Sequence, residues 1–534
     1  MRSHRIFLFS RPPILSLTLF FIISFSLFPI IPEAWSATYF VDATSGNDTN
    51  SGFSPETPWK TIAKVNSSGF NPGDQILFKR GEAWREKLVV PSSGSSNNPI
   101  VFSAYGSGNK PTIVGSDAIT IWTNIGGNVW DATVTTQPGV VWFNGTSGIK
   151  ETAKTNLNAS TEWFWAGNVL SVYSAISPTN IEAASRGSSI IASGHSYLKC
   201  SNFNLIRSGN FNSGANLQLG SGSSEIEVDA CDFSQADTCH IGIWGTASGN
   251  FTISNCTFAY SGLGHYIGAG NAIDVTRNTE ATSLLVTVQH STFTHIGDWI
   301  GSQYHDHGIY FKSGRLIWRY NHVNNGGVET GAGVKISGNA QNGCEVYYNI
   351  FSKGSGTQSW GVLSEAGSSH KIYNNVFYGV GTGVWQAGPH GPTVAGGSGI
   401  AVKNNIFHST DYRFLLASTV HGTQGTVTTN FISDHNLFYN GSATPLQWGP
   451  NAYSLADWKI NTKQDADSKT NNPDFMDPSQ GNFTLQSSSP CIDAGTDVGL
   501  NQDFQRTFVP RGAQVDIGAF ESRISRIRST NRSH

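Results

Sequence analysis

Charge is the scarcest property of this chain. Only 13% of its 534 residues are Asp, Glu, Lys or Arg, whereas globular proteins usually hold about a quarter. The formal net charge is −3, and no basic run interleaved with aromatic residues occurs in the repeated part of the sequence. Nucleic-acid-binding surfaces need such a basic footprint, so we expect no nucleic-acid partner.

Cysteine is also scarce, and its spacing excludes a common class of metal site. No two of the six cysteines lie close together in the way that zinc sites require. They are Cys200, Cys231, Cys239, Cys256, Cys344 and Cys491. Cys231 and Cys256 occupy one position of successive repeats, so an exported protein could bridge them. We favour the alternative, in which both are small buried residues that fill the stack.

Long apolar runs are missing except at the start of the chain. Residues 1–36 hold three arginines, an apolar stretch from Ile14 to Ile31 and a small-x-small cleavage site at Ala34-Trp-Ser36. This pattern predicts a signal peptide. An uncleaved anchor is the alternative, although Pro29 and Pro32 weaken the stretch as a membrane span. We expect a secreted, periplasmic or cell-surface monomer with no stable membrane span after cleavage.

Glycine, in contrast, is abundant, and the chain repeats. There are 59 glycines, and together with Asn, Ser and Thr they separate short apolar segments. Between residues 200 and 440 a polar or small residue is followed nine times, after one spacer, by an apolar anchor. The anchors are Phe203, Phe233, Phe258, Phe293, Val323, Phe351, Phe377, Phe407 and Phe438. Their spacings of 25 to 35 residues fall in the range of repeat architectures.

The position two residues before each anchor indicates the kind of repeat. These residues are Ser201, Cys231, Cys256, Ser291, Asn321, Asn349, Asn375, Asn405 and Asn436. Asparagines stacked on parallel strands about 4.8 Å apart can hydrogen-bond amide to amide. Helical repeats would instead show a 3.6-residue apolar period, which these segments lack. We predict an all-β parallel β-helix; the alternative is a β-sandwich with coincidental spacing.

The rest of the chain divides around this repeat. The expected parts are a signal peptide (1–36), an N-terminal cap and first turns (37–115), an inserted β-unit (116–190), the β-helix repeats (191–445), a C-terminal end and cap (446–522) and a disordered tail (523–534). The cap should include a short helix near Thr61 to Asn66. Tryptophans of the inserted unit could stack on sugar rings, although a compact β-core is the favoured use.

The two ends of the mature chain support this interpretation by resemblance. Tyr39-Phe-Val-Asp42 near the start, Val515-Asp-Ile-Gly-Ala-Phe-Glu521 near the end and the asparagine stack resemble the secreted right-handed parallel β-helix proteins of bacteria, the pectate-lyase-like superfamily. The resemblance implies fold and export. It does not imply one activity, because this scaffold carries lyases, hydrolases, epimerases and adhesins.

Chemistry on such a fold is built from side chains stacked on neighbouring turns. One strand recurs as a small residue followed by Ile or Val, and the residue after that pair should point outward. The resulting outward column is Asp274, Tyr310, Lys335, Leu363 and Trp385, and two residues further on it is Thr276, Lys312, Ser337, Glu365 and Ala387. Titratable residues of three consecutive turns therefore gather on one face, which makes it a candidate site.

The densest titratable segment directly precedes one of these strands. It is Tyr304-His-Asp-His-Gly-Ile-Tyr310, and it makes His305, Asp306 and His307 candidates together with Tyr310. The imidazoles could instead hydrogen-bond the backbone of a turn. The aspartates could cap turns. The lysines could lie on a solvated outer face.

Gly331-Ala-Gly-Val-Lys-Ile-Ser-Gly338 is similar to the strand that carries the catalytic lysine of family-nine polysaccharide lyases. That resemblance implies Lys335 as the base and Asp306 as part of the segment that supplies calcium ligands, to which Asp274 on the preceding turn could add another. His307 and Tyr310 stand where the family has aspartates. Calcium needs six to eight oxygen ligands, so the missing carboxylates count against it.

The predicted activity is β-elimination on a uronic-acid-containing polysaccharide. The catalytic candidates are Lys335, Tyr310, His305 and His307, and the substrate-binding candidates are Lys312, Glu365, Trp385 and Arg319. A lysine base would need a lowered pKa, and Tyr310 or a histidine could protonate the leaving oxygen. Two alternatives stay open: glycoside hydrolysis by Asp274, Asp306 and Glu365, and glycan binding without catalysis by Trp385, Trp360 and Trp299.

Overall fold

The structure is a computed structural model, and it describes residues 36–209, 214–263, 270–276, 283–296, 306–325, 331–353, 359–387, 398–409, 413–417, 430–441 and 445–522. Residues 1–35 of the predicted signal peptide, the predicted tail, Trp299 and His305 lie outside these residues. No helix among them is long and apolar enough to cross a membrane.

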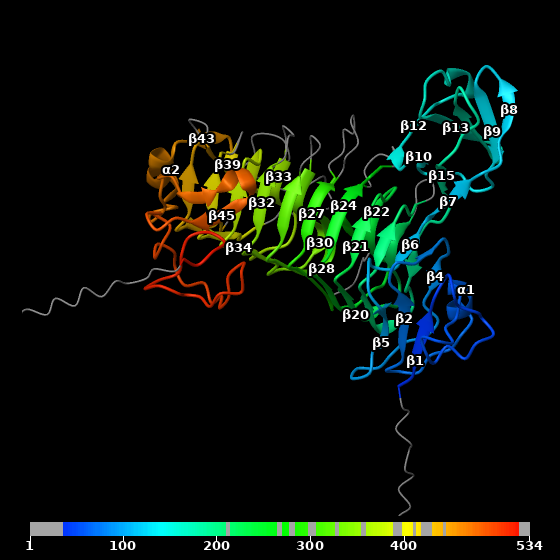
Figure 1. Cartoon of the computed structure of the whole chain (residues 1–534). Helices are drawn as coiled ribbons and strands as arrows, with labels where there is room; N and C mark the ends of the chain where they lie inside the picture. The colour runs from blue at the N-terminus through cyan, green and yellow to red at the C-terminus, as the bar shows by residue number, and fades with distance from the viewer. Residues whose placement is uncertain are drawn as a thin grey trace, which may run out of the picture. The chain divides into compact units, whose positions relative to one another are not determined.

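Three parallel sheets, here called A, B and C, are visited in that order by each turn of the chain, and strands of successive turns lie side by side (Figure 1). Sheet A contains β1 (Thr38–Val41), β2 (Gln75–Lys79), β5 (Ile100–Tyr105), β17 (Ser196–Ser201), β20 (Ser224–Asp229), β23 (Gly249–Ser254), β26 (Leu284–Gln289), the end of β28 (Ile309–Arg319), β31 (Glu345–Tyr347), β34 (Lys371–Tyr373), β37 (Ala401–Lys403) and β40 (Ile432–Asp434).

Sheets B and C complete each turn. Sheet B contains β3 (Ala83–Trp84), β6 (Thr112–Val114), β18 (Asn204–Ile206), β21 (Asp232–Ser234), β24 (Thr257–Ser261), β27 (Thr292–Ile296), β29 (His322–Asn325), β32 (Ile350–Lys353), β35 (Val376–Tyr378), β38 (Ile406–His408) and β41 (Leu437–Tyr439). Sheet C contains β4 (Leu88–Val89), β16 (Ile190–Ile191), β19 (Ala215–Leu219), β22 (Cys239–Trp244), β25 (Ile273–Thr276), the start of β28, β30 (Gly331–Ala340), β33 (Ser359–Ser364), β36 (Thr382–Gln386), β39 (Arg413–Ala417), β42 (Leu446–Trp448) and the antiparallel β43 (Asn451–Tyr453). The predicted all-β fold with long parallel sheets is confirmed, while the closed, right-handed course of its turns stays a prediction.

The predicted asparagine stack is present at the corner between sheets A and B. The backbone N–H of Asn321, Asn349, Asn375 and Asn405 each donates to the side-chain oxygen of the asparagine one turn later, at 2.9 Å. The preceding residue turns the corner in the left-handed region, as Asn374 does with φ +53°. Buried phenylalanines stack inside sheet B with ring centroids about one strand spacing apart, for example 4.8 Å between Phe377 and Phe407.

The sequence-based register is wrong at the first repeat. Leu205, rather than Phe203, pairs with Phe233, so Phe203 instead of Ser201 occupies the ladder position. Phe203 and Leu205 are both apolar and fully buried, and an alternating pattern does not show which of them is the anchor. From Phe233 to Phe438 the register is as predicted.

Smaller elements accompany the three sheets. The short helix α1 (Ile62–Asn66) has Thr61 as its N-cap, as the sequence indicates. Two further sheets are formed by β7 (Ser116–Ile119), β8 (Thr123–Gly126), β9 (Val129–Thr133), β10 (Val141–Phe143), β11 (Thr146–Ser147), β12 (Ile149–Lys150), β13 (Glu162–Ala166), β14 (Val169–Tyr173) and β15 (Ile181–Ala184), with a 3₁₀ turn at Lys154–Asn156.

The C-terminal part covers the corner between sheets A and B. It contains α2 (Leu455–Thr462), β44 (Phe475–Asp477), a 3₁₀ turn at Pro478–Gln480 and β45 (Asn482–Leu485). The side chain of Asn374 donates to the carbonyls of Asp516 and Gly518. Ile517 and Phe520 are buried in one cluster with Tyr348 of the corner. The outer side of the ladder is therefore closed by the chain itself.

Candidate functional site

The predicted outward column exists on sheet C. Asp274 pairs with Tyr310, Tyr310 with Lys335, Lys335 with Leu363, and Leu363 with Trp385 across adjacent parallel strands. The β-branched residue before each member lies in the core, as Ile309 and Val334 do. Alternation along a strand then directs the column to the outer face.

Tyr310 is the centre of a charged cluster on this face. The Lys312 Nζ lies 4.5 Å from the centroid of the Tyr310 ring, and the Lys335 Nζ lies 5.1 Å from it. Lys312 is two residues along the same strand, and Lys335 is on the next strand. Two ammonium groups therefore flank one phenol, a position in which they can attract an anionic ligand.

Glu365 follows β33 and closes the other side of the cluster. Its Oε2 is 3.4 Å from the Lys335 Nζ and accepts a 2.9 Å hydrogen bond from the Ser337 hydroxyl. Glu365 is 1% exposed and Lys335 is 8% exposed. The Lys335 ammonium is thus already engaged by a buried carboxylate before any ligand is considered.

Asp274 lies on the opposite side of Tyr310. Its carboxylate accepts hydrogen bonds from the Asn271 amide at 3.2 Å and from the Trp244 indole at 3.4 Å. Burial raises the pKa of Asp274, while hydrogen bonds, with Thr276 first, and the nearby charge of Lys312 oppose the rise. Asp274 therefore joins the cluster as a carboxyl whose charged form is disfavoured by burial.

The side chains of Asp306 and His307 accept hydrogen bonds from the backbone of neighbouring turns. Asp306 Oδ1 accepts the N–H of Gly270 at 2.8 Å, and burial raises the pKa of Asp306 to about 6. His307 is 2% exposed, its Nδ1 accepts the N–H of Ala332 at 2.9 Å, and its ring lies 5.5 Å from that of Tyr310. His307 therefore has the backbone-bonding role that was the alternative to catalysis.

Two of the predicted substrate-binding residues do not join this cluster. Arg319 lies in sheet A, where its guanidinium donates to Gln289 and to the hydroxyl of Tyr347. Trp385 is on the predicted column but is only 7% exposed, because it packs with Leu363 and the ring of Trp360. Its ring is therefore covered rather than presented as an open stacking platform.

The predicted calcium ligands do not fit a calcium site. Asp274 and Asp306 are each occupied by hydrogen-bond donors, and burial raises the pKa of both. Within the described ranges, a group of three close ligand atoms occurs only at Asp434, His435 and Asp467, away from this cluster. Calcium requires several charged oxygens at one point, which these residues do not supply.

Sequence reasoning missed Trp244 and Asn271. Trp244 pairs with Thr276, which lies one turn later, so extending the aligned column by one turn toward the N-terminus would have found Trp244. Asn271 contacts Asp274 and also accepts the N–H of His307. That bridge depends on the path of the chain between sheets B and C, which has no repeated pattern.

No protein-family model matches the chain. The lacto-N-biosidase of Bifidobacterium longum subsp. longum is 37% identical over 82 residues, which are 14% of this chain. The match spans only 5% of that protein's length.

Among solved structures, XylC in complex with xylose is similar over 91% of this chain and 99% of its own, with a TM-score of 0.54 and 14% identity. A glycoside hydrolase is similar over 76% and 96%, with a TM-score of 0.51 and 10% identity. Pectate lyase Pel9A covers 91% and 97%, with a TM-score of 0.44 and 14% identity. XylC and the glycoside hydrolase therefore share the overall fold of this chain.

Proposed function

We propose that this protein is an exported enzyme that cleaves a uronic-acid-containing polysaccharide by β-elimination on the outer face of sheet C. The observation that carries the proposal is the phenol of Tyr310 between the ammonium groups of Lys312 and Lys335, on adjoining strands. Among the described titratable residues, Tyr310 is a group that can transfer a proton, and Lys312 and Lys335 are two cations that can hold a carboxylate.

The reaction requires this combination. The proton on C5 of a uronate is weakly acidic, and removing it places negative charge next to the sugar carboxylate. Lys312 and Lys335 would neutralise that carboxylate. The side-chain oxygen of Tyr310 would take the C5 proton and return it to the O4 oxygen as the C4–O4 bond breaks, which leaves a double bond between C4 and C5.

This assignment differs from the sequence-based expectation that Lys335 is the base. The Lys335 ammonium contacts the buried Glu365 carboxylate, and that arrangement supports a cationic role. Lys335→Arg separates the two roles, because arginine keeps the charge and cannot act as a base in proteins. We expect Lys335→Arg to retain part of the activity and Lys335→Ala to lose it. An inactive Lys335→Arg that folds normally would restore Lys335 as the base.

Glycoside hydrolysis is the second candidate. It is favoured by one observation, the buried Asp306 carboxyl whose pKa is raised to about 6, since a general acid must be protonated near the working pH. XylC with xylose and the lacto-N-biosidase are neighbours of this chain. However, Asp306 already accepts the Gly270 N–H.

One assay distinguishes the candidates. The mature protein is incubated with polyuronates and with neutral polysaccharides, with and without a calcium chelator. Ultraviolet absorbance from a new double bond, unaffected by the chelator, is expected with a polyuronate only. New reducing ends without that absorbance would replace elimination by hydrolysis. If neither product forms and the protein is retained on immobilised polymer, the remaining function is glycan binding without catalysis.

A further inference from the structure

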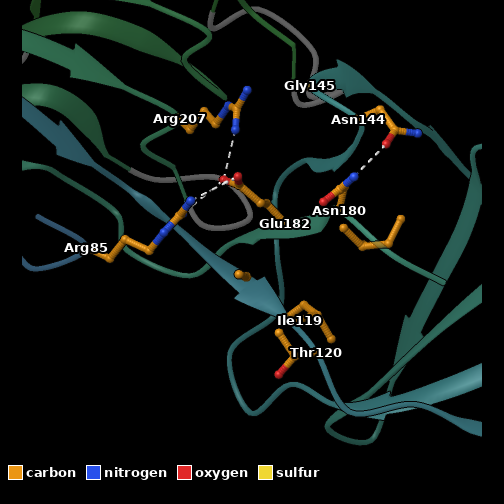
Figure 2. A pocket seen from close by; sticks show the side chains of 10 residues that line it. Arg85, Ile119, Thr120, Asn144, Gly145, Asn180, Glu182 and Arg207 are labelled. Carbon is orange, nitrogen blue, oxygen red and sulfur yellow. Dashed lines mark hydrogen bonds and ion pairs between the residues drawn. The ribbon is translucent and has the colours of Figure 1, made fainter. Parts of the chain in front are cut away.

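A polar cavity separate from the Tyr310 cluster lies between the strands β7 and β15 and the first turns of the three sheets. Its volume is about 570 Å³, within the range of pockets that hold small ligands. Figure 2 shows Arg85 and Arg207 approaching Glu182 from two sides, with Asn144 and Asn180 across the cavity. Arg85 and Arg207 come from the turns next to sheet B, whereas Glu182 is on β15.

The charges in this cavity are not balanced. Arg85 binds both oxygens of Glu182, at 2.9 and 3.0 Å, and the Arg207 Nη1 lies 2.9 Å from the same carboxylate. Burial acts to raise the pKa of Glu182, but hydrogen bonds from Arg85, Ser116 and Arg207 lower it to about 2. Glu182 is therefore an anion at any ordinary pH. Two guanidinium groups thus share one carboxylate, and the cavity keeps one excess positive charge.

Part of this positive charge is open to a ligand. Arg207 uses its Nε for Gln235 and its Nη1 for Glu182, and within the described ranges no acceptor contacts its Nη2. That Nη2 lies near Gly145, where a Cβ atom would come within 3.5 Å of it. A planar guanidinium with unused N–H groups is suited to a carboxylate.

The opposite wall supplies groups for hydroxyls. Asn180 donates to the side-chain oxygen of Asn144 at 3.3 Å, and both residues are exposed. The second amide proton of Asn180, the amide of Asn144 and the exposed hydroxyl of Thr120 remain for other partners. A ligand with one carboxylate and several hydroxyls matches both walls.

We propose that this cavity binds a uronic acid residue of a glycan, as an anchoring site separate from the place of cleavage. Arg207 directly follows β18, and the next strand of the chain, β19, is three strands from β28 in sheet C. Three strand spacings place the two sites on the order of 14 Å apart along the stack. One extended glycan could therefore reach both. Binding here requires no cleavage, so the inference goes beyond the proposed function.

The test adds a negative charge at the exposed rim. Ala118 pairs directly with Glu182 across β7 and β15 and is exposed, so Ala118→Glu places a second carboxylate in the cavity, and Ala118→Gln is its uncharged control of the same size. Full-length protein carrying Tyr310→Phe, which prevents turnover, is titrated calorimetrically with trimers of galacturonic, glucuronic and mannuronic acid, with the corresponding neutral trimers, and with acetate.

We expect an acidic trimer to bind the Ala118→Gln protein and to bind the Ala118→Glu protein about tenfold more weakly, while both variants unfold at the same temperature. Neutral trimers and acetate should not compete. Equal affinity of the two variants, equal affinity for neutral trimers, full competition by acetate, or no binding of any acidic trimer would each overturn the proposal. Because cleavage is assayed separately, an inactive protein that passes this test would refute the lyase proposal alone.

Discussion

The corner between sheets A and B and the outer face of sheet C are built from the same turns in opposite ways. At the corner, one residue type recurs: five successive ladder positions are asparagine, and each step repeats a 2.9 Å hydrogen bond. On the outer face of sheet C the residue changes at every turn, from Asp274 to Tyr310, Lys335 and Leu363. Repetition accompanies contacts that stabilise the stack, whereas variation accompanies candidate chemistry.

The two regions also differ in what covers them. The corner is closed by the C-terminal segment, whose backbone accepts hydrogen bonds from Asn374. On sheet C, the side chains of Tyr310 and Lys312 are half-buried rather than enclosed. Substitutions at the corner should therefore change stability, and substitutions around Tyr310 should change activity.

The largest effect is expected at Tyr310. Tyr310→Phe removes the hydroxyl that would transfer the proton and should lower the rate of double-bond formation by about a thousandfold, equivalent to about 4 kcal/mol. The free energy of unfolding should be unchanged, because the ring contacts with Lys312 and Lys335 remain. The rate is measured by ultraviolet absorbance and the stability by denaturant titration. A variant with full activity would remove Tyr310 from the mechanism.

The next effect is expected at the corner. Asn375 is fully buried, accepts the N–H of Asn349, and donates to Asn405 and to the carbonyl of Val346. Asn375→Ala leaves several of these buried groups without partners, so we expect a loss of about 3 kcal/mol in the free energy of unfolding. Denaturant titration measures this loss.

Activity of the folded Asn375→Ala protein should be unchanged, in contrast to Tyr310→Phe. A drop in activity measured well below the unfolding transition would show that the corner and the outer face are coupled.

A smaller effect, dependent on pH, is expected at Asp306. Burial raises its pKa to about 6, above the ordinary value of 3.8, so the stability that it contributes is fully present below the ordinary pKa and is lost as pH rises through about 6. Asp306→Asn can still accept the Gly270 N–H and carries no charge. We expect it to be more stable than the wild type at pH 8, by about 2 kcal/mol, and equal to it at pH 4.

Denaturant titrations at the two pH values measure this difference. A gain of the same size at both would mean that Asp306 does not change its protonation in this range. The cleavage assay on Asp306→Asn also bears on the hydrolase alternative, because a general acid replaced by an amide would lose activity.

The smallest effect is expected in the N-terminal half of the ladder. Cys256 is buried at a ladder position, and its thiol donates to backbone carbonyls, including that of Ser254. All six cysteines are free and buried, so the bridge between Cys231 and Cys256 is not formed. Cys256→Ala should cost about 1 kcal/mol, well below Asn375→Ala, because a thiol is a weak donor.

Thiol labelling provides the control for this last variant. In the native protein no cysteine should react with the labelling reagent. In the unfolded protein six cysteines should react, or five in Cys256→Ala. Fewer reactive sites in the unfolded wild type would reveal a disulfide.

Parts of the site were predictable because they follow from the repeat. Alignment of Ile273, Ile309 and Val334 was sufficient to place Asp274, Tyr310 and Lys335 in one column. Arg319 lies in sheet A because β28 runs without interruption from sheet C into sheet A, and Gly314, with φ +81°, lies within that strand. The alternation of inward and outward residues along a strand does not predict such a bend.

Other contacts could not be read from any pattern. The Nδ1 of His307 is occupied by the N–H of Ala332, and the Lys335 ammonium by Glu365, each on a neighbouring turn. The arginine cavity joins Arg85, Glu182 and Arg207, which are separated by 97 and 25 residues and lie on unrelated elements. Long-range contacts of single side chains leave no periodic signal.

The sequence by itself determined that the chain is all-β, that it repeats about every thirty residues and that asparagines stack at one corner, because a repeated residue in a repeated strand must meet its own copies one turn away. Only the tertiary structure decided which face is covered, which charges pair and where the cavity between β7, β15 and the first turns lies. Those depend on the paths of the connections between strands, and the connections do not repeat.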